Sequence, residues 1–267
     1  MENYSVLMSV YYKETATNLR QSIDSMLCQT VKPNQFLIIC DGPLSKELDD
    51  VLLEYEKNNC IELYRLEKNG GLGEALKIGI GLCRNDFILR MDSDDYSVPS
   101  RAEKEISLLK IYDIVGSNIV EFENEITNTI GMRRVPETQK QIIKFSKKRS
   151  PFNHPSVAFR KSAVLASGNY EHFLYLEDYY LWIRMIQHGA KCFNIQAPLV
   201  FMRSGLTMRS RRGGKEYLKS LKKLRKYMLQ TKYINFFQFI LYSCLSGILL
   251  RLPIKLKEKV YTHFLRK

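Results

Sequence analysis

Hydrophobic residues in the first 120 positions fall alternately into short continuous runs and into helically spaced sets. The continuous runs predict buried strands at 5–11, 36–40, 61–66 and 87–91. Apolar residues recur at helical spacing between them, which predicts helices near 19–27, 48–55 and 73–83. Alternation of continuous apolar strands with helices is typical of an α/β fold, in which a mostly parallel sheet is flanked by helices.

The pattern is looser beyond position 120. We expect a strand at 113–120, a short basic helix after Pro136, a strand at 156–159 and a helix at 178–189. The chain therefore divides into a domain at 1–212, with halves at 1–120 and 121–212, and a tail at 213–267.

Charge sets the tail apart from the rest of the chain. The formal net charge is +13, yet residues 200–267 contain 17 basic and only 2 acidic residues. With 45% hydrophobic and 26% charged residues the chain is predicted to be globular. Six cysteines without a CxxC pair give no zinc spacing and suit a reducing cytoplasm, and the N-terminus does not resemble a signal peptide.

Three carboxylates follow the fourth predicted strand directly. Asp92, Asp94 and Asp95 lie within four residues, where their charges repel one another unless a cation is present. Oxygen ligands favour Mg²⁺ or Mn²⁺, which complete their coordination with water and substrate phosphates. The alternative is a solvated acidic turn in which Asp94 or Asp95 caps a helix at Pro99.

A glycine-rich segment, NGGLGEALKIGI, joins the third strand to the third helix at 69–80. This position suits a loop that contacts phosphate. Leu76 occupies the third glycine position of the dinucleotide fingerprint, and no P-loop motif occurs. The alternative is a tight turn whose small residues let the helix pack close to the sheet.

Four motifs now occur in a fixed order: Asp41-Gly42, the 69–73 loop with Ala75, the acidic cluster with Pro99 and Arg101, and Glu177-Asp178 before a Trp-bearing helix. This arrangement resembles the inverting family 2 glycosyltransferases, which have the nucleotide-sugar-binding GT-A fold. It is most similar to bacterial enzymes of exopolysaccharide, capsule or lipopolysaccharide O-chain assembly, and the resemblance covers about residues 4–205.

The resemblance implies a role for each matching residue. Residues 1–120 would bind the nucleotide sugar, which we expect to be a UDP-sugar, and residues 121–212 would bind the acceptor and supply the catalytic base. Asp94 would be the metal ligand and Asp178 the catalytic base, with Glu177 supporting it. The residues that would contact the nucleotide sugar are Val10, Tyr11, Tyr12, Glu14, Asp41, Asn69, Gly73, Asp92 and Ser93. The family's proline before the first-strand turn is absent, which leaves the base contact less defined than the metal site.

Three further residues are candidates on the acceptor side. His154, in an Asn-His-Pro-Ser segment, would border the acceptor or serve a structural role. Arg203 and Arg209 would reach the diphosphate from a loop that glycines make flexible, or belong to a solvated basic linker.

The tail combines a basic amphipathic helix at 215–226 with 18 uncharged residues at 233–250. Three interpretations are open: the tail lies on the membrane, spans it, or packs on the catalytic domain as a helical pair. We favour an interfacial anchor at the cytoplasmic face, which suits a lipid-linked saccharide acceptor.

Two other functions are compatible with parts of the sequence. A sugar-phosphate nucleotidyltransferase normally has a glycine-rich basic loop after its first strand, and the turn VYYKETATN has no glycine. Nucleic-acid binding through the basic tail is a non-enzymatic alternative. The uncharged run at 233–250 favours lipid instead, so no nucleic-acid partner is expected.

Overall fold

The computed structural model describes residues 2–204 and 214–251. The first half alternates strands and helices as predicted. It contains β1 (Tyr4–Val10), α1 (Ala16–Leu27), β2 (Gln35–Cys40), α2 (Lys46–Tyr55), β3 (Ile61–Arg65), α3 (Leu72–Leu82) and β4 (Phe87–Asp92). Thr15 caps α1 by accepting the Asn18 N–H at 3.3 Å.

The second half extends the same sheet. It contains β5 (Tyr96–Ser97), α4 (Arg101–Leu109), β6 (Ile114–Glu123), β7 (Glu125–Arg133), α5 (Gln139–Ser146), a 3₁₀ turn η1 (His154–Ser156), β8 (Ala158–Arg160), α6 (Lys161–Ala166), α7 (Glu177–Gln187) and β9 (Cys192–Arg203). The hydrophobic pattern did not predict β5, β7, α6 or β9.

The strands form one sheet in the order β3-β2-β1-β4-β8-β6-β9-β5, with β7 paired to β6. Strands β1 to β4 are parallel, β8 is antiparallel to both of its neighbours, and β6 pairs with β9 in parallel. The chain runs from β1 to β3 on one side and then returns to place β4 on the other side of β1. The carboxyl ends of β2, β1 and β4 therefore meet at a topological switch point, where α/β sheets bind ligands.

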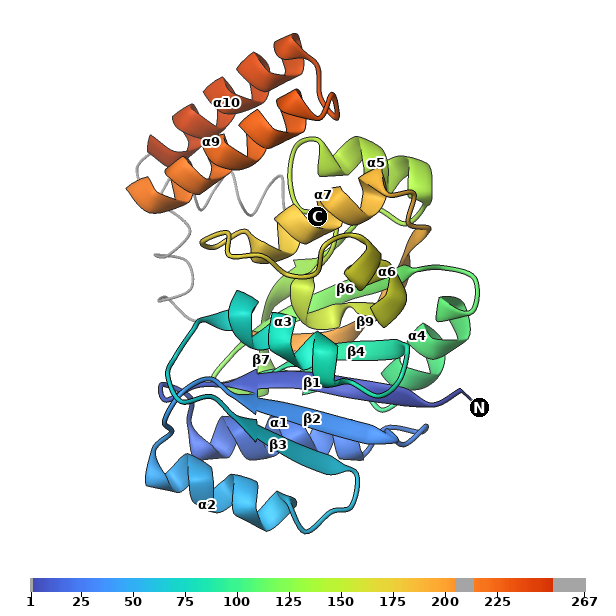
Figure 1. Cartoon of the computed structure of the whole chain (residues 1–267), viewed down its shortest axis with the longest axis vertical. Helices are drawn as coiled ribbons and strands as arrows, with labels where there is room; N and C mark the ends of the chain where they lie inside the picture. The colour runs from blue at the N-terminus through green and yellow to red at the C-terminus, as the bar shows by residue number, and fades with distance from the viewer. Residues whose placement is uncertain (1, 205–213, 252–267) are drawn as a thin grey trace.

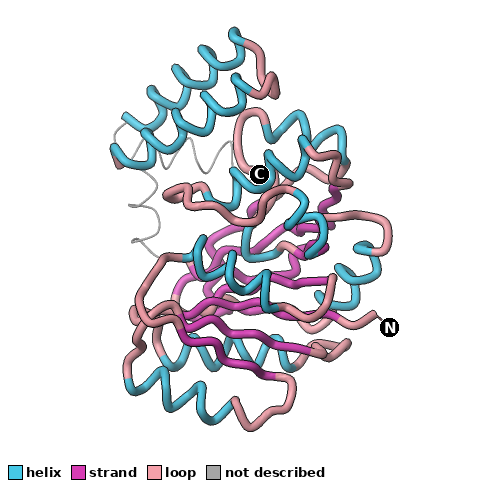
Figure 2. Tube along the Cα trace, viewed as in Figure 1, coloured by secondary structure: helices cyan, strands magenta, loops and turns pink. Residues whose placement is uncertain are grey.

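Two hydrophobic cores cover the two faces of the sheet. Side chains alternate along β1, so that Val6 and Met8 join one core and Leu7 the other. Helices α1 and α2 lie on the first face and α3 on the second (Figure 1). Figure 2 shows helices on both sides of the sheet, as a buried parallel sheet requires. The predicted α/β fold class is confirmed.

The tail forms two helices, α9 (Lys215–Gln230) and α10 (Phe236–Arg251). Leu221, Leu224 and Met228 of α9 belong to a buried cluster with Tyr179 and Ile183 of α7. The interpretation of the tail as a helical pair packed on the catalytic domain is thus confirmed for α9. Within the described part of the chain, no helix has both the length and the hydropathy needed to cross a membrane.

Candidate active site

The acidic cluster lies at the end of β4, at the switch point of the sheet. Asp92 is the last residue of the strand, and Ser93 and Asp94 form a turn. One carboxylate oxygen each from Asp92, Asp94 and Asp95 lies within 4.8 Å of the others. The turn gathers all three carboxylates at one place. Helix α4 begins at Arg101 after Ser100, so neither Asp94 nor Asp95 caps it.

A buried arginine neutralises the first of these carboxylates. Arg90, in the middle of β4, is 1% exposed and donates from both terminal nitrogens to the Asp92 carboxylate, with Nη1 at 2.6 Å from Oδ2. The Ser22 hydroxyl also donates to the Asp92 carbonyl oxygen at 2.6 Å. These contacts fix the side chain and the backbone of Asp92. Sequence analysis missed Arg90, although a charge inside the apolar run FILRM was a signal for it.

Asp94 and Asp95 are held in an environment that disfavours their ionised forms. Burial, together with the nearby charges of Asp92 and Glu14, raises the pKa of Asp94 to about 7. Burial and the charge of Asp94 raise the pKa of Asp95 well above its usual value. Asp95 Oδ1 accepts the Arg203 N–H at 2.8 Å, but its buried Oδ2 has no hydrogen-bond partner. A hard divalent cation fits this donor set, because it would satisfy the orphan oxygen and offset the repulsion.

Arg203 is fixed at the acidic turn and does not lie on a flexible loop, contrary to expectation. It is the last residue of β9, and its guanidinium donates to the Asp94 carbonyl oxygen at 3.1 Å and to Gln21 Oε1 at 2.8 Å. The same group lies 4.6 Å from the Phe122 ring centroid. The strand pairing of β9 with β6 explains the difference. Arg209 lies outside the described residues.

The turn after β1 contacts the acidic turn through one hydrogen bond. The Ser93 hydroxyl donates to Glu14 Oε2 at 2.9 Å, while Glu14 Oε1 accepts the Thr15 N–H at 2.8 Å. The rings of Tyr11 and Tyr12 meet edge to face, and Tyr12 is 54% exposed. The side chain of Val10 is fully buried in the core, so this residue offers only its backbone to the site.

Asp41, at the end of β2, organises the glycine loop. Its Oδ1 accepts the Gly70 N–H at 2.7 Å, and its Oδ2 accepts the Gly71 N–H and the Asn69 Nδ2–H, both at 3.0 Å. Gly42 has a φ of 85°, and a Cβ there would lie 2.6 Å from the Asn69 nitrogen. The Asp41-Gly42 pair and the 69–71 loop therefore form one unit, which the sequence showed only as two separate motifs.

The Glu177-Asp178 pair occupies the first turn of α7, against the start of α3. A Cβ on Gly73 would lie 2.9 Å from Glu177 Cγ, so these two predicted residues are in close contact. Burial, reinforced by the charge of Asp178, raises the pKa of Glu177 to about 7. Asp178 is half-buried beside it.

Tyr170 is buried beside His154, within electrostatic reach of both acidic groups, and sequence analysis missed it. It is fully buried, and its hydroxyl shares a 2.9 Å hydrogen bond with His154 Nε2. Burial raises the pKa of Tyr170, and the charges that act on its hydroxyl come from the four residues Arg90, Asp92, Glu177 and Asp178. His154 therefore has the structural partner that the alternative interpretation expected. Nothing in the sequence distinguishes Tyr170 from the other 15 tyrosines.

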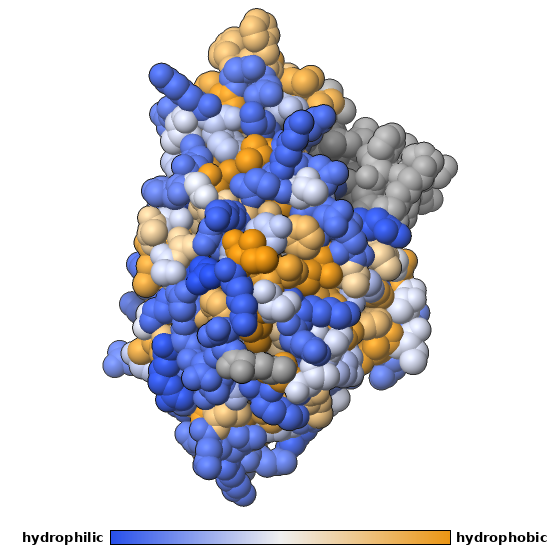
Figure 3. Space-filling view, turned by 90° about the vertical axis from the view of Figure 1, so that its right-hand side faces the viewer, coloured by the Kyte–Doolittle hydropathy of each residue, from blue (hydrophilic) through white to orange (hydrophobic). Residues whose placement is uncertain are grey.

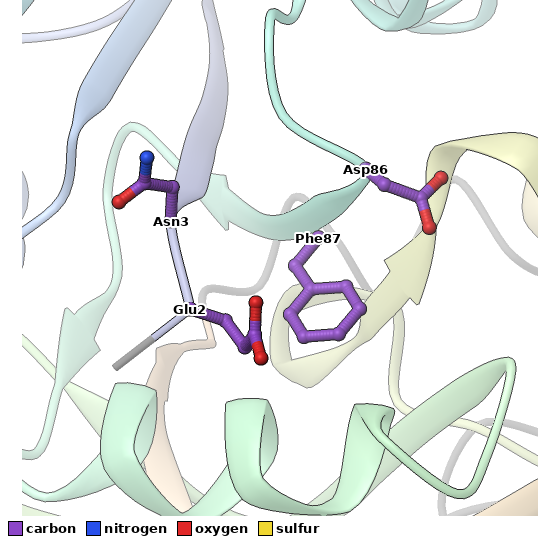
Figure 4. Close-up of a pocket in the computed structure, with 4 residues that line it drawn as sticks. All are labelled: Glu2, Asn3, Asp86 and Phe87. Atoms are coloured by element: carbon purple, nitrogen blue, oxygen red, sulfur yellow. The ribbon is translucent and has the colours of Figure 1, made fainter.

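A surface hollow of about 310 Å³ lies elsewhere on the molecule. Glu2, Asn3, Asp86 and Phe87 line it, at the amino ends of β1 and β4 (Figure 4). This is the end of the sheet opposite the acidic turn. The functional residues gather instead at the carboxyl ends of the strands.

Sequence comparison places this fold and site in a known class. Residues 5–167 match the family described as Glycosyl transferase family 2, and the chain belongs to that family. It is 39% identical to an uncharacterized glycosyltransferase of Haemophilus influenzae, with 99% of both chains covered. It is 34% identical to the amylovoran biosynthesis glycosyltransferase AmsE of Erwinia amylovora, with 97% of both covered.

A third relative has a named acceptor. The UDP-Gal:alpha-D-GlcNAc-diphosphoundecaprenol beta-1,3-galactosyltransferase of Escherichia coli is 35% identical, over 99% of this chain and 97% of the relative.

Solved structures share the fold at low sequence identity. TarS residues 1–349 of S. aureus, solved in complex with UDP-GlcNAc, gives a TM-score of 0.69 at 14% identity, over 95% of this chain and 77% of that one. GalNAc-T7, solved with UDP, GalNAc and Mn²⁺, gives 0.70 at 17% identity, over 100% and 55%. The fold is therefore of the GT-A type expected from the motifs.

Proposed function

We propose that the chain transfers a sugar from a UDP-sugar to a lipid-linked saccharide, with inversion at the anomeric carbon, in surface polysaccharide assembly. One observation carries the proposal: Gly73, which follows the glycine loop held by Asp41, packs against Glu177, so that a Cβ on Gly73 would lie 2.9 Å from Glu177 Cγ. A nucleotide site and a catalytic base therefore border one another. The name of the Escherichia coli relative supports both the donor class and the acceptor class.

The acidic turn would hold Mg²⁺ or Mn²⁺, with Asp94 as the principal ligand. The charge cluster and the orphan Asp95 oxygen support this assignment, as does the Mn²⁺ in the GalNAc-T7 complex. When bound, the ion stabilises negative charge on the departing nucleoside diphosphate. Arg90 holds the Asp92 carboxylate in place beside Asp94.

The donor's base and ribose would lie against the ends of β1 and β2. A carboxylate has about four lone-pair sites, and Asp41 uses three of them on the glycine loop, so one remains for a base N–H. Tyr11 and Tyr12 border this position and offer ring surfaces for stacking. Glu14 and Ser93 tie the turn after β1 to the acidic turn.

Asp178 would remove the acceptor proton. A sugar hydroxyl has a very high pKa, so it needs a carboxylate positioned to take its proton as the oxygen attacks. The acceptor oxygen forms a bond to the anomeric carbon while the bond to the diphosphate oxygen breaks, and the proton passes to Asp178. One displacement of this kind inverts the anomeric centre. Glu177 sets the position of Asp178, and His154 and Arg209 remain candidates for acceptor contacts.

The acceptor class implies a place of action. A saccharide on a lipid carrier is presented at a membrane surface, so we infer that the enzyme works in the cytoplasm, peripherally associated with the inner face of the cell membrane. Family membership favours sugar transfer over nucleotidyl transfer and over nucleic-acid binding, because it is a family of glycosyl transferases.

A donor screen with purified full-length protein tests the proposal. We expect UDP release from one UDP-sugar, lost on chelation and restored by Mg²⁺ or Mn²⁺. Asp94→Asn should lower kcat by about 10²-fold or more, the usual loss when a group stabilising developing charge is removed. Asp50→Asn, an exposed aspartate on α2, is the matched control and should retain full activity. Unimpaired turnover after exhaustive chelation would contradict the metal assignment.

A further inference from the structure

Helix α10 carries its large apolar side chains on its exposed side. These side chains are between 44% and 82% exposed, and they recur at helical spacing i, i+1, i+4, i+5 and i+9. They therefore share one half of the helix surface. We call this surface the outer face of α10, and it consists of Phe236, Phe237, Ile240, Leu241 and Leu245.

The two serines of α10, Ser243 and Ser246, lie on the opposite half. Ser246 accepts a hydrogen bond from the Arg225 guanidinium of α9 at 2.6 Å, and Arg225 is 4% exposed. The Ser243 hydroxyl is buried, and Phe239 packs against the cluster between α9 and α7. A helix that faces water has the reverse arrangement, with polar residues outward. The outer face is thus suited to an apolar environment.

The outer face has a fixed relation to the candidate base. Leu221 and Leu224 of α9 share a buried cluster with Tyr179, the residue after Asp178. The Tyr179 hydroxyl donates to the Ser146 carbonyl oxygen at 2.5 Å, and the Ser146 hydroxyl shares a hydrogen bond with the Tyr233 hydroxyl between α9 and α10. Any surface that binds α10 therefore also orients the start of α7.

The outer face of α10 could contact a lipid surface or a second copy of the chain, and the charge around it favours the lipid surface. The four lysines Lys219, Lys222, Lys223 and Lys226 of α9 are exposed, and residues 200–267 hold 17 basic and 2 acidic residues. Contact between two copies would bring two such segments together, whereas an anionic bilayer supplies opposite charge. Figure 3 shows apolar and hydrophilic residues side by side on the lobe at the top of the molecule, which α9 and α10 form.

The length of α10 sets how it meets a bilayer. Its 16 residues span about 24 Å at about 1.5 Å per residue. The hydrocarbon core is about 30 Å thick, so a helix of this length lies along the interface.

We propose that the outer face of α10 inserts into the acyl boundary of an anionic phospholipid bilayer, while the α9 lysines contact lipid phosphates. The docked helix pair then holds α7, and with it Asp178, beside the membrane surface. The purpose of this orientation rests on the proposed lipid-linked acceptor. The membrane contact itself does not, because it needs neither donor nor metal.

Vesicle sedimentation of the full-length protein tests the inference without nucleotide sugar or metal. We expect binding to vesicles of equal parts phosphatidylethanolamine and phosphatidylglycerol, and much weaker binding to phosphatidylcholine alone. The double variant Phe237→Ser, Leu241→Ser should bind about tenfold less or weaker still. The matched control is Leu53→Ser, Ile111→Ser, which removes two side chains of similar exposure, 53% and 63%, far from α10 and should bind like the wild type.

Fluorescence gives a second measurement. Trp182 is the single tryptophan and is fully buried, so a Phe237→Trp variant reports on α10 above a constant background. Its emission should shift to the blue when anionic vesicles are added.

Unchanged binding of the outer-face variant, or no binding of the wild type, overturns the inference. So does a wild-type dimer in light scattering that the outer-face variant converts to monomer. Sugar transfer to a soluble acceptor without vesicle binding refutes only this inference, and vesicle binding without transfer refutes only the proposed function.

Discussion

Glu177 and Asp178 are neighbours in sequence, and we propose different roles for them. Glu177 faces the start of α3, where its Cγ lies against Gly73, and its pKa is raised to about 7 by burial and by the charge of Asp178. Asp178 follows in the first turn of α7 and is half-buried beside Glu177. The resemblance to family 2 glycosyltransferases assigns the base to Asp178, so we propose Asp178 as the base and Glu177 as the residue that positions it.

We predict that Asp178→Asn lowers kcat by about 10²- to 10⁴-fold, because an amide cannot take the proton of the acceptor hydroxyl. Glu177→Gln should lower kcat by only about tenfold, since it retains size and hydrogen bonding. Steady-state kinetics at saturating donor and acceptor measure both. Equal losses in the two variants would show that the pair acts as one unit, and a larger loss in Glu177→Gln would exchange the roles.

Tyr170 is predicted to position the site without taking part in the reaction. Tyr170→Phe leaves the His154 Nε2 without its 2.9 Å partner and removes the hydroxyl that both acidic groups act on. We expect the free energy of unfolding to fall by about 1–3 kcal/mol, the cost of an unsatisfied buried group. Urea denaturation measures this, and kcat should fall less than in Asp178→Asn. A neutral effect on both quantities would remove Tyr170 from the site.

The sequence predicted those helices and strands that have a clear hydrophobic pattern of their own. β1 to β4 are continuous apolar runs, and α1 to α3 show helical spacing, so their positions matched within a few residues. β9 contains Pro198 and mixed polarity, and it pairs with β6 through an irregular register and with β5. β7 is mostly half-exposed and polar and forms a hairpin with β6, and β5 has two residues. None of these strands has a continuous or regularly alternating apolar pattern from which it could be predicted.

The same limit applies to the site. The acidic cluster, Asp41 and the Glu177-Asp178 pair were visible as residue types at strand or helix ends. The contacts between them were not, because Gly73 meets Glu177, and Asp41 meets Gly70, only after the sheet has formed. Arg203 was wrongly placed on a loop for this reason: its position depends on the undetected strand β9.

Two glycines of α3 offer a matched test of the contact between Gly73 and Glu177. Gly73→Ala would place a Cβ 2.9 Å from Glu177 Cγ, so the Glu177 side chain must move. We expect kcat/KM to fall by about tenfold, because small displacements of catalytic groups cost rate steeply. Gly81→Ala, in the same helix, has no neighbour within 4 Å of the added Cβ. That control should keep full activity and raise the free energy of unfolding by up to about 1 kcal/mol. Equal activity of both variants would show that the contact does not position Glu177.

For the molecule as a whole, the carboxyls with raised pKa values should make stability depend on pH and on metal. The pKa of Asp94 is about 7 in the folded protein against an ordinary value of 3.8, and the pKa of Asp95 is also raised. At pH values between about 4 and 7, the folded state therefore binds more protons than the unfolded state. The free energy of unfolding therefore falls as pH rises from about 4 to 7, and the cost is complete above pH 7.

Asp94→Asn isolates this effect from the other titrating groups. In EDTA at pH 8 the variant should be about 1–3 kcal/mol more stable than the wild type, a range that allows for solvent screening, and the difference should vanish near pH 4. Mn²⁺ should reverse the order at pH 8, because a ligand that binds only the folded state stabilises it in proportion to RT ln(1 + [L]/Kd). At pH 5, where Asp94 is protonated, Mn²⁺ should have little effect, since metal ligands must lose their protons. Thermal melts of both proteins at pH 5 and pH 8, with and without Mn²⁺, and at pH 4 in EDTA measure these differences. A wild type that Mn²⁺ stabilises equally at pH 5 and pH 8, or a variant that responds as the wild type does, would mean that the ion binds elsewhere.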